Sequence, residues 1–164
     1  MEAMRFSLDY YSTQFGPYPY QQLRIMEFPR YRAFAQSFPN AIPFSEALGF
    51  LMDIDGEQDL DMVFYITAHE LAHQWWGNQL EAANVVGQKF VLETLAQYSA
   101  TMVFKKKYPQ EKVDQLLQHQ YEDYQHGIRQ LKIVEPPLIY VEDEKHLYYE
   151  KGALNMYALQ QYIG

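Results

Sequence analysis

The sequence predicts a single α+β domain that is mostly helical, with a small sheet packed against the helices. Apolar residues recur at helical spacing over most of the chain, while short alternating or extended segments occur only before residue 53. The length of 164 residues suffices for one ordinary apolar core, and a composition of 48% hydrophobic and 21% charged residues is typical of a globular chain. We therefore expect one domain over residues 1–164.

The first predicted elements are a helix and two extended segments. A helix over residues 2–15 is predicted by one apolar face, formed by Met4, Leu8, Tyr11 and Phe15. A strand is predicted over 23–28, where Pro29 ends it and confines it to a sheet edge or a strand end. Residues 41–52 are expected to be extended, so that the sheet is mixed or antiparallel.

Four helices are predicted in the rest of the chain. Carboxylates between residues 53 and 61 favour the start of a helix over about 59–76, which the pair Gly77-Asn78 ends. Their spacing does not fit a calcium loop of the EF-hand type, which needs Gly at position 6 and Glu at position 12. The other helices are expected over residues 88–108, 109–133 and 147–163.

Charge and composition exclude several classes of function. The formal net charge of −8 argues against a surface for phosphate groups, so we expect no nucleic-acid partner. No apolar run approaches the length of about 20 residues that a membrane-spanning helix needs, and residues 1–11 lack the pattern of an export signal. Because the chain has no Cys, any metal must be bound by nitrogen and oxygen ligands.

The pattern HExxH occurs in the helix predicted over 59–76, as HELAH at residues 69–73. Residues four apart in an α-helix are turned by about 400° and lie about 6 Å apart along the axis, so His69 and His73 project from one side and can reach one ion. Glu70 lies beside such an ion, where its carboxylate can take a proton from an attacking water. The pattern therefore predicts a metal-dependent hydrolase with Glu70 as the catalytic base.

A catalytic zinc site needs a third protein ligand and leaves one position open for water or substrate. Glu93 is the candidate, separated from His73 by nineteen residues and in the next predicted helix. Its neighbours in the sequence are largely apolar, and a carboxylate buried among them is costly unless a cation neutralises it. The alternative is an exposed helix residue. We predict one Zn²⁺ per chain, bound by His69, His73 and Glu93, although the ligand types also accept other divalent metals.

Two segments resemble the M1 family of zinc aminopeptidases, members of the gluzincin clan with a thermolysin-like catalytic domain. They are HELAHQWWGN at residues 69–78 and VLETLAQY at residues 91–98. The second segment usually reads L-N-E-G-F-A-x-Y in that family, so Leu92 and Thr94 depart from it, and the gap between His73 and Glu93 is one residue longer than usual. The resemblance implies a thermolysin-like zincin fold, zinc as the cofactor, and hydrolysis at the free N-terminus of a peptide substrate.

The resemblance extends to two further segments. Residues 149–152 match the family segment Y-E-K-G, whose Tyr hydrogen-bonds the developing oxyanion, which implies this role for Tyr149 rather than for Tyr148. A neutral phenol aimed at growing negative charge stabilises the transition state more than the ground state. Residues 43–50 resemble a reduced form of the segment G-A-M-E-N, whose Glu binds the substrate's α-amino group, and this implies that contact for Glu46.

The chain most resembles bacterial M1-like domains in proteins that also carry transporter-permease segments. This implies a soluble catalytic part of a larger, membrane-associated bacterial protein. Two other functions stay open. One is a metal-dependent endopeptidase, in which Glu46 is only structural; the other is a catalytically silent peptide-binding or regulatory module of a membrane transporter.

Overall fold

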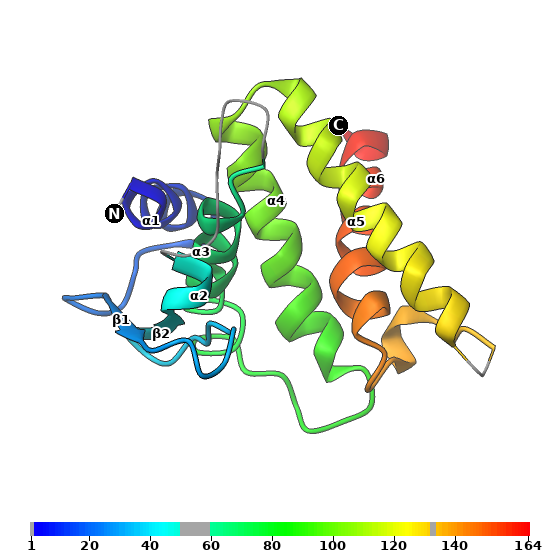
Figure 1. Cartoon of the computed structure of the whole chain (residues 1–164), viewed down its shortest axis with the longest axis horizontal. Helices are drawn as coiled ribbons and strands as arrows, with labels where there is room; N and C mark the ends of the chain where they lie inside the picture. The colour runs from blue at the N-terminus through cyan, green and yellow to red at the C-terminus, as the bar shows by residue number, and fades with distance from the viewer. Residues whose placement is uncertain (1, 50–59, 132–133) are drawn as a thin grey trace.

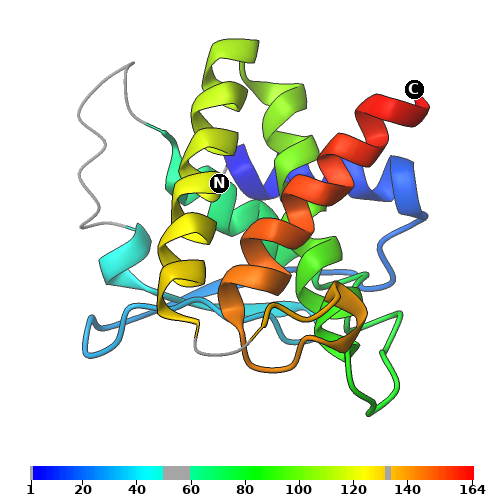
Figure 2. The ribbon, with the colours of Figure 1, turned by 90° about the vertical axis from the view of Figure 1, so that its right-hand side faces the viewer.

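Helices make up most of the fold in the computed structural model, which describes residues 2–49, 60–131 and 134–164. In chain order the elements are α1 (Glu2–Phe15), β1 (Arg24–Phe28), β2 (Ala41–Ser45), α2 (Glu46–Gly49), α3 (Met62–Ala72), η1 (Phe90–Thr94), α4 (Leu95–Lys107), α5 (Gln110–Gln130), η2 (Leu138–Tyr140), η3 (Leu147–Lys151) and α6 (Gly152–Ile163). The sheet lies along one edge of the molecule, below the helices in Figure 2. The predicted α+β, mostly helical class is confirmed.

The sheet consists of β1 and β2, which pair in parallel from Arg24–Ala41 to Phe28–Ser45. Of the two predicted forms of the sheet, mixed or antiparallel, the antiparallel one is therefore wrong for this strand pair. A parallel pair needs a connection of about a dozen residues or more, and the segment 29–40 provides it. Residues 35 and 38 of that segment also contact β2 through isolated antiparallel bridges, so the segment stays close to the sheet.

The main core lies between α1, α3 and α4 (Figure 1). Helix α3 packs against both of the others, and Ala68 and Leu71 on it are fully buried. Tyr11 of α1 is also fully buried, and its hydroxyl donates to the Ala68 carbonyl over 3.0 Å. Because this buried hydroxyl has a partner, it is not left unsatisfied in the core. These contacts fix the helix that carries the HExxH residues, and α5 and α6 pack on α4.

Helix α3 is shorter than the predicted range 59–76. It begins at Met62 because the Asp61 side chain caps it and accepts a hydrogen bond from the Phe64 amide over 2.8 Å. It ends at Ala72, and the following turns close where Gly77 has a φ of 126°. A positive φ favours glycine in this turn, but the regular helix ends at Ala72, so the predicted end at residue 76 is wrong.

Other elements end earlier than predicted or contain a turn of a different helix type. The expected extended segment 41–52 is a strand only to residue 45, because α2 follows directly, and residues 50–59 lie outside the described part of the chain together with most of the acidic run. Helix α5 ends at residue 130, whereas the prediction extended to 133. Residues 132–133 lie outside the described part of the chain. The helices predicted over 88–108 and 147–163 both contain a π-helical turn.

Among the described residues, no helix combines the length and the apolar character that are needed to cross a bilayer.

Candidate metal centre and active site

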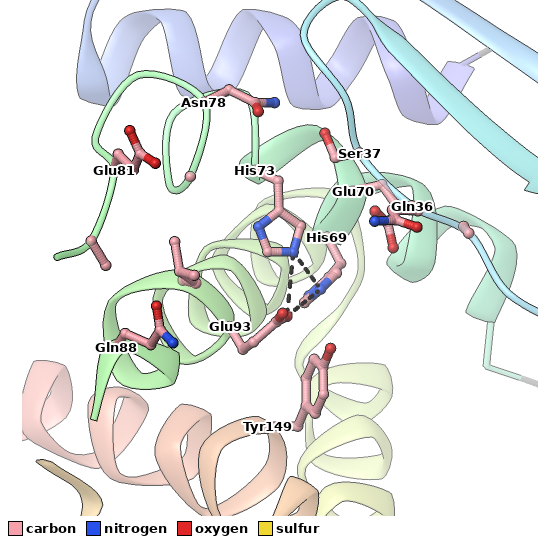
Figure 3. A pocket seen from close by; sticks show the side chains of 14 residues that line it. Gln36, Ser37, His69, Glu70, His73, Asn78, Glu81, Gln88, Glu93 and Tyr149 are labelled. Atoms are coloured by element: carbon pink, nitrogen blue, oxygen red, sulfur yellow. Dashed lines mark hydrogen bonds and ion pairs between the residues drawn. The ribbon is translucent and has the colours of Figure 1, made fainter. Parts of the chain in front are cut away.

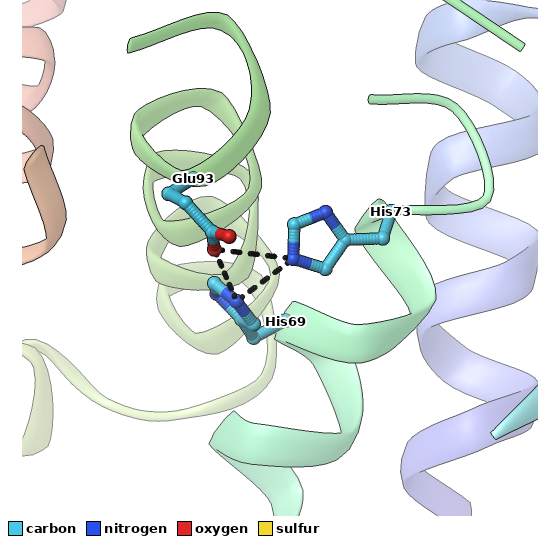
Figure 4. Close-up of side chains that lie close together, drawn as sticks. All are labelled: His69, His73 and Glu93. Atoms are coloured by element: carbon cyan, nitrogen blue, oxygen red, sulfur yellow. Dashed lines mark hydrogen bonds and ion pairs between the residues drawn. The ribbon is translucent and has the colours of Figure 1, made fainter. Parts of the chain in front are cut away.

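The three predicted ligand side chains converge between α3 and η1 (Figure 4). The Nε2 atoms of His69 and His73 are 3.1 Å apart, and Glu93 Oε2 lies 3.5 Å from the first and 3.4 Å from the second. Bonds of about 2.0–2.2 Å from a tetrahedral zinc ion place its ligand atoms about 3.3–3.5 Å from one another. Both distances to Glu93 Oε2 match this spacing, and the distance between the two imidazole nitrogens is about 0.2 Å shorter, so the three atoms lie close to the arrangement that one zinc ion needs.

Hydrogen bonding orients His73 so that a lone pair faces the other two ligand atoms. Its Nδ1 lies 3.0 Å from the carbonyl oxygen of Trp76, which can only accept, so Nδ1 carries the proton. The neutral ring then has an unprotonated Nε2, as a metal ligand must. Glu93 Oε2 is buried and has no hydrogen-bond partner among the described residues. An unpaired buried oxygen of this kind fits a site for a cation.

The electrostatics of the ligand cluster favour positive charge at its centre. Burial raises the pKa of the Glu93 carboxyl, but its close contacts with the imidazoles of His69 and His73 together outweigh burial and hold this pKa well below its usual range. Burial lowers the pKa of His73, and its contacts with Glu93 reverse this, so the net shift is upward. The cluster is therefore a place where a proton or a divalent cation is stabilised.

Glu70 lies beside the ligand cluster rather than in it (Figure 3). Its side chain is on α3 and lines the same cavity as the three ligands. Burial raises the pKa of its carboxyl, while the nearby His69 and His73 and a backbone hydrogen bond from Ser37 act in the opposite direction. A carboxylate whose pKa is moved upward by burial is suited to accepting and returning a proton.

Tyr149 approaches the cluster from η3, with its hydroxyl directed toward the cavity (Figure 3). Its ring centre is 5.6 Å from that of His69. Burial raises the pKa of the Tyr149 phenol well above its usual range, and the negative charge of Glu93 adds to this, so the hydroxyl keeps its proton and can donate. Of the two adjacent tyrosines, Tyr149 lines the cavity and Tyr148 does not.

The cavity that contains these residues has a volume of about 430 Å³. It lies between the segment beside the sheet, at residues 35–37, and the helical turns that carry the ligands, with the loop 77–88 on another side. Its size is within the range of about 300–1,000 Å³ that is usual for small-ligand sites. One cavity thus holds two imidazoles, a carboxylate ligand, a second carboxylate and a phenol.

Comparison with known proteins agrees with this constellation. The sequence pattern of the Peptidase family M1 domain matches residues 1–164. This chain belongs to peptidase family M1. Over 81 residues it is 33% identical to "Probable aminopeptidase 1" of Sulfurisphaera tokodaii, a match that covers 49% of this chain and only 10% of that protein. Neither match concerns a transporter, so the association with a permease stays a prediction.

Glu46 is not among the residues that line the cavity of this M1 domain. It is the first residue of α2, and its Oε1 accepts a hydrogen bond from the Arg30 amide over 2.9 Å. The fold therefore brings Glu46 to the segment after β1 and does not bring it to the ligand cluster. Its contact with a substrate amine stays a prediction.

Gln74 is a residue of the M1 domain that sequence reasoning missed. Its side chain is fully buried, and its Nε2 donates to Ser37 Oγ over 2.6 Å and to the Phe38 carbonyl over 2.8 Å. Its Oε1 accepts from the Asn40 amide over 3.0 Å. These bonds tie the cavity wall at Ser37 to the end of α3, next to His73. The available signal was a polar residue directly after the HExxH pattern.

Further polar side chains complete the cavity wall and were also missed. They are Gln36, Asn78, Glu81 and Gln88. They lie in irregular segments or at a helix start, where neither periodicity nor a metal-binding pattern marks them. Their side chains supply the cavity with polar groups that can form hydrogen bonds with a peptide backbone.

Proposed function

We propose that this chain is a zinc-dependent peptidase that removes residues from the N-terminus of peptides. The observation that carries the proposal is the mutual spacing of the ligand atoms of His69, His73 and Glu93, which fits a tetrahedral ion. Membership of a peptidase family supports peptides as the substrate class, and the name of the relative supports action at the N-terminus.

The three ligands, Glu70 and Tyr149 have distinct roles in the proposed reaction. Zinc, when bound by the three ligands, supplies Lewis-acid polarisation of the scissile carbonyl. Glu70 takes a proton from the attacking water and returns it to the leaving amine. Tyr149 donates a hydrogen bond to the carbonyl oxygen as negative charge develops there. That these side chains line one cavity supports their acting on the same peptide bond.

Tyr149→Phe is expected to lower kcat by about 10²–10³-fold, the usual effect of removing one donor to an oxyanion. KM and zinc content should change little, because the hydroxyl acts mainly in the transition state and is not a ligand. Steady-state kinetics and elemental analysis measure both. Tyr148→Phe is the matched control, since its ring is adjacent but does not line the cavity. An equal loss in the two variants would contradict the role of Tyr149.

Specificity for N-termini is tested with one peptide in two forms, with a free and with an acetylated α-amino group. The free form should be cleaved with a kcat/KM at least about 30-fold higher, because loss of one partner of a charge pair costs about 2–5 kcal/mol. If Glu46 makes this contact, Glu46→Gln reduces the ratio. Glu27→Gln, which removes an exposed carboxylate from β1, should leave the ratio unchanged.

A metal-dependent endopeptidase is the second candidate function, and the position of Glu46 favours it. The Glu46 carboxylate is engaged by the Arg30 amide and lies outside the cavity lining. Without an anion that recognises the α-amino group, the enzyme would accept peptides in the interior of a chain. Equal rates on the free and acetylated peptides would establish this alternative and overturn removal of N-terminal residues.

A further inference from the structure

Two π-helical turns meet beside the cavity, and each carries one of its functional side chains. Glu93 is on η1 and Tyr149 is on η3, and the two turns pack against each other. A π turn contains an extra residue, which changes the direction of the side chains around it, and such turns are frequent at functional sites. The relative position of η1 and η3 therefore sets how Glu93 and Tyr149 face each other.

Thr94 makes the contact that joins these two turns. Its side chain is fully buried, and its Oγ1 donates to the Tyr148 carbonyl over 2.5 Å. A buried hydroxyl and a buried carbonyl satisfy each other in this way. Because Thr94 directly follows Glu93 and Tyr148 directly precedes Tyr149, one hydrogen bond links the backbone beside both functional residues.

Gly152 gives Thr94 the space that this contact needs. A Cβ atom at Gly152 would lie 2.4 Å from Thr94 Oγ1 and 2.7 Å from Thr94 Cγ2, closer than atoms in van der Waals contact can approach. The Thr94 side chain therefore occupies the place where a side chain of residue 152 would begin. The two residues are complementary in shape: Thr94 on η1, with a hydroxyl and a methyl, faces Gly152, which has no side chain and begins α6 directly after η3.

We propose that Thr94 is a positioning residue that holds the Tyr149 turn against the Glu93 turn. It touches neither the substrate nor the ligand atoms, and it is not among the residues that line the cavity. Thr94 acts indirectly: its hydrogen bond holds the Tyr148 carbonyl, and the backbone there positions the phenol of Tyr149. The effect on catalysis rests on the proposed function, whereas the coupling between the two turns does not.

The coupling is tested in the full chain by hydrogen exchange with mass spectrometry, with and without added Zn²⁺. Thr94→Val keeps the shape and removes the hydroxyl, and it should speed exchange at residues 147–152 about five- to tenfold, the effect of losing one buried hydrogen bond. Thr94→Ser keeps the hydroxyl and should stay within about twofold of the original rate.

Thr101→Val is the matched control for this experiment. Thr101 is also a fully buried threonine, on α4, which follows η1 directly. Its Oγ1 donates to the Gln97 carbonyl and lies 3.1 Å from the Tyr65 hydroxyl, and among the described residues it has no hydrogen bond to η3. It should not change exchange at residues 147–152 selectively. The proposal is overturned if Thr94→Val leaves this segment unchanged, or if it speeds exchange equally throughout the chain.

The catalytic consequence is tested by a double-mutant cycle. Thr94→Val should lower kcat about tenfold without a similar change in KM. In a Tyr149→Phe background it should lower kcat less than about twofold, because the hydrogen bond from the Tyr149 hydroxyl, which Thr94 supports, is then already absent. Equal losses in both backgrounds would overturn a role through Tyr149. If the original chain hydrolyses no peptide, the proposed function has failed, and the exchange result still decides whether Thr94 couples the two turns.

Discussion

His73→Ala is expected to lose bound zinc. The original chain should carry one zinc ion per molecule after dialysis, and the variant should carry less than about a tenth of that. Mutation of an outer partner of a metal ligand alone weakens binding about 10–100-fold, so removal of a ligand should weaken it at least as much. Elemental analysis of the purified proteins gives the metal content directly.

His119→Ala serves as the control for this measurement. His119 is an exposed histidine that lies 3.1 Å from the Asp123 carboxylate on α5, far from the ligand cluster in the sequence and on another helix. The variant should keep one zinc ion per molecule. If His73→Ala still binds one zinc ion per molecule, the three side chains do not form the metal site. The proposed hydrolysis would then lack its metal ion.

Glu70→Gln is expected to keep its zinc and to lose hydrolysis. The amide has nearly the shape of the carboxylate but cannot accept the proton of an attacking water, so kcat should fall by about 10²–10⁴-fold. Only 8% of Glu70 is accessible to solvent, so the substitution hardly changes the charge of the protein surface. The loss of activity is therefore expected to come from the loss of the proton acceptor. Peptide hydrolysis and zinc content are measured on the same preparation.

Glu81→Gln separates this effect from a general change of charge in the cavity. Glu81 also lines the cavity, but it is exposed and lies in the loop after Gly77. Its substitution should leave kcat within a few-fold of the original. If Glu70→Gln instead leaves every measured property unchanged, a catalytically silent peptide-binding module becomes the better description of this chain.

Elements governed by local sequence were predictable, and those governed by distant contacts were not. The helix Glu2–Phe15 has its predicted bounds because an apolar face and a following glycine are both local signals. The parallel pairing of β1 with β2 was missed because strand direction depends on the path of the segment between them. The π turns have no period of their own in the sequence, and their partners lie on other elements.

The same distinction holds for the candidate site. Helical geometry alone brings His69 and His73 together, and the apolar surroundings of Glu93 point to a neutralising cation. Tyr149 is one of 15 tyrosines, and only the family resemblance distinguishes it before its place in the cavity is known. Thr94 was only a departure from a family pattern, because its partner Gly152 lies in a different segment.

The buried amide of Gln74 has a consequence for how a peptide is accommodated. To move the segment 37–40 away from α3, the chain would have to break hydrogen bonds at both ends of that amide inside the protein. Ser37 and His73 are therefore held at a set separation by the scaffold. The distance across the cavity between these two residues is thus set by the fold before any ligand binds.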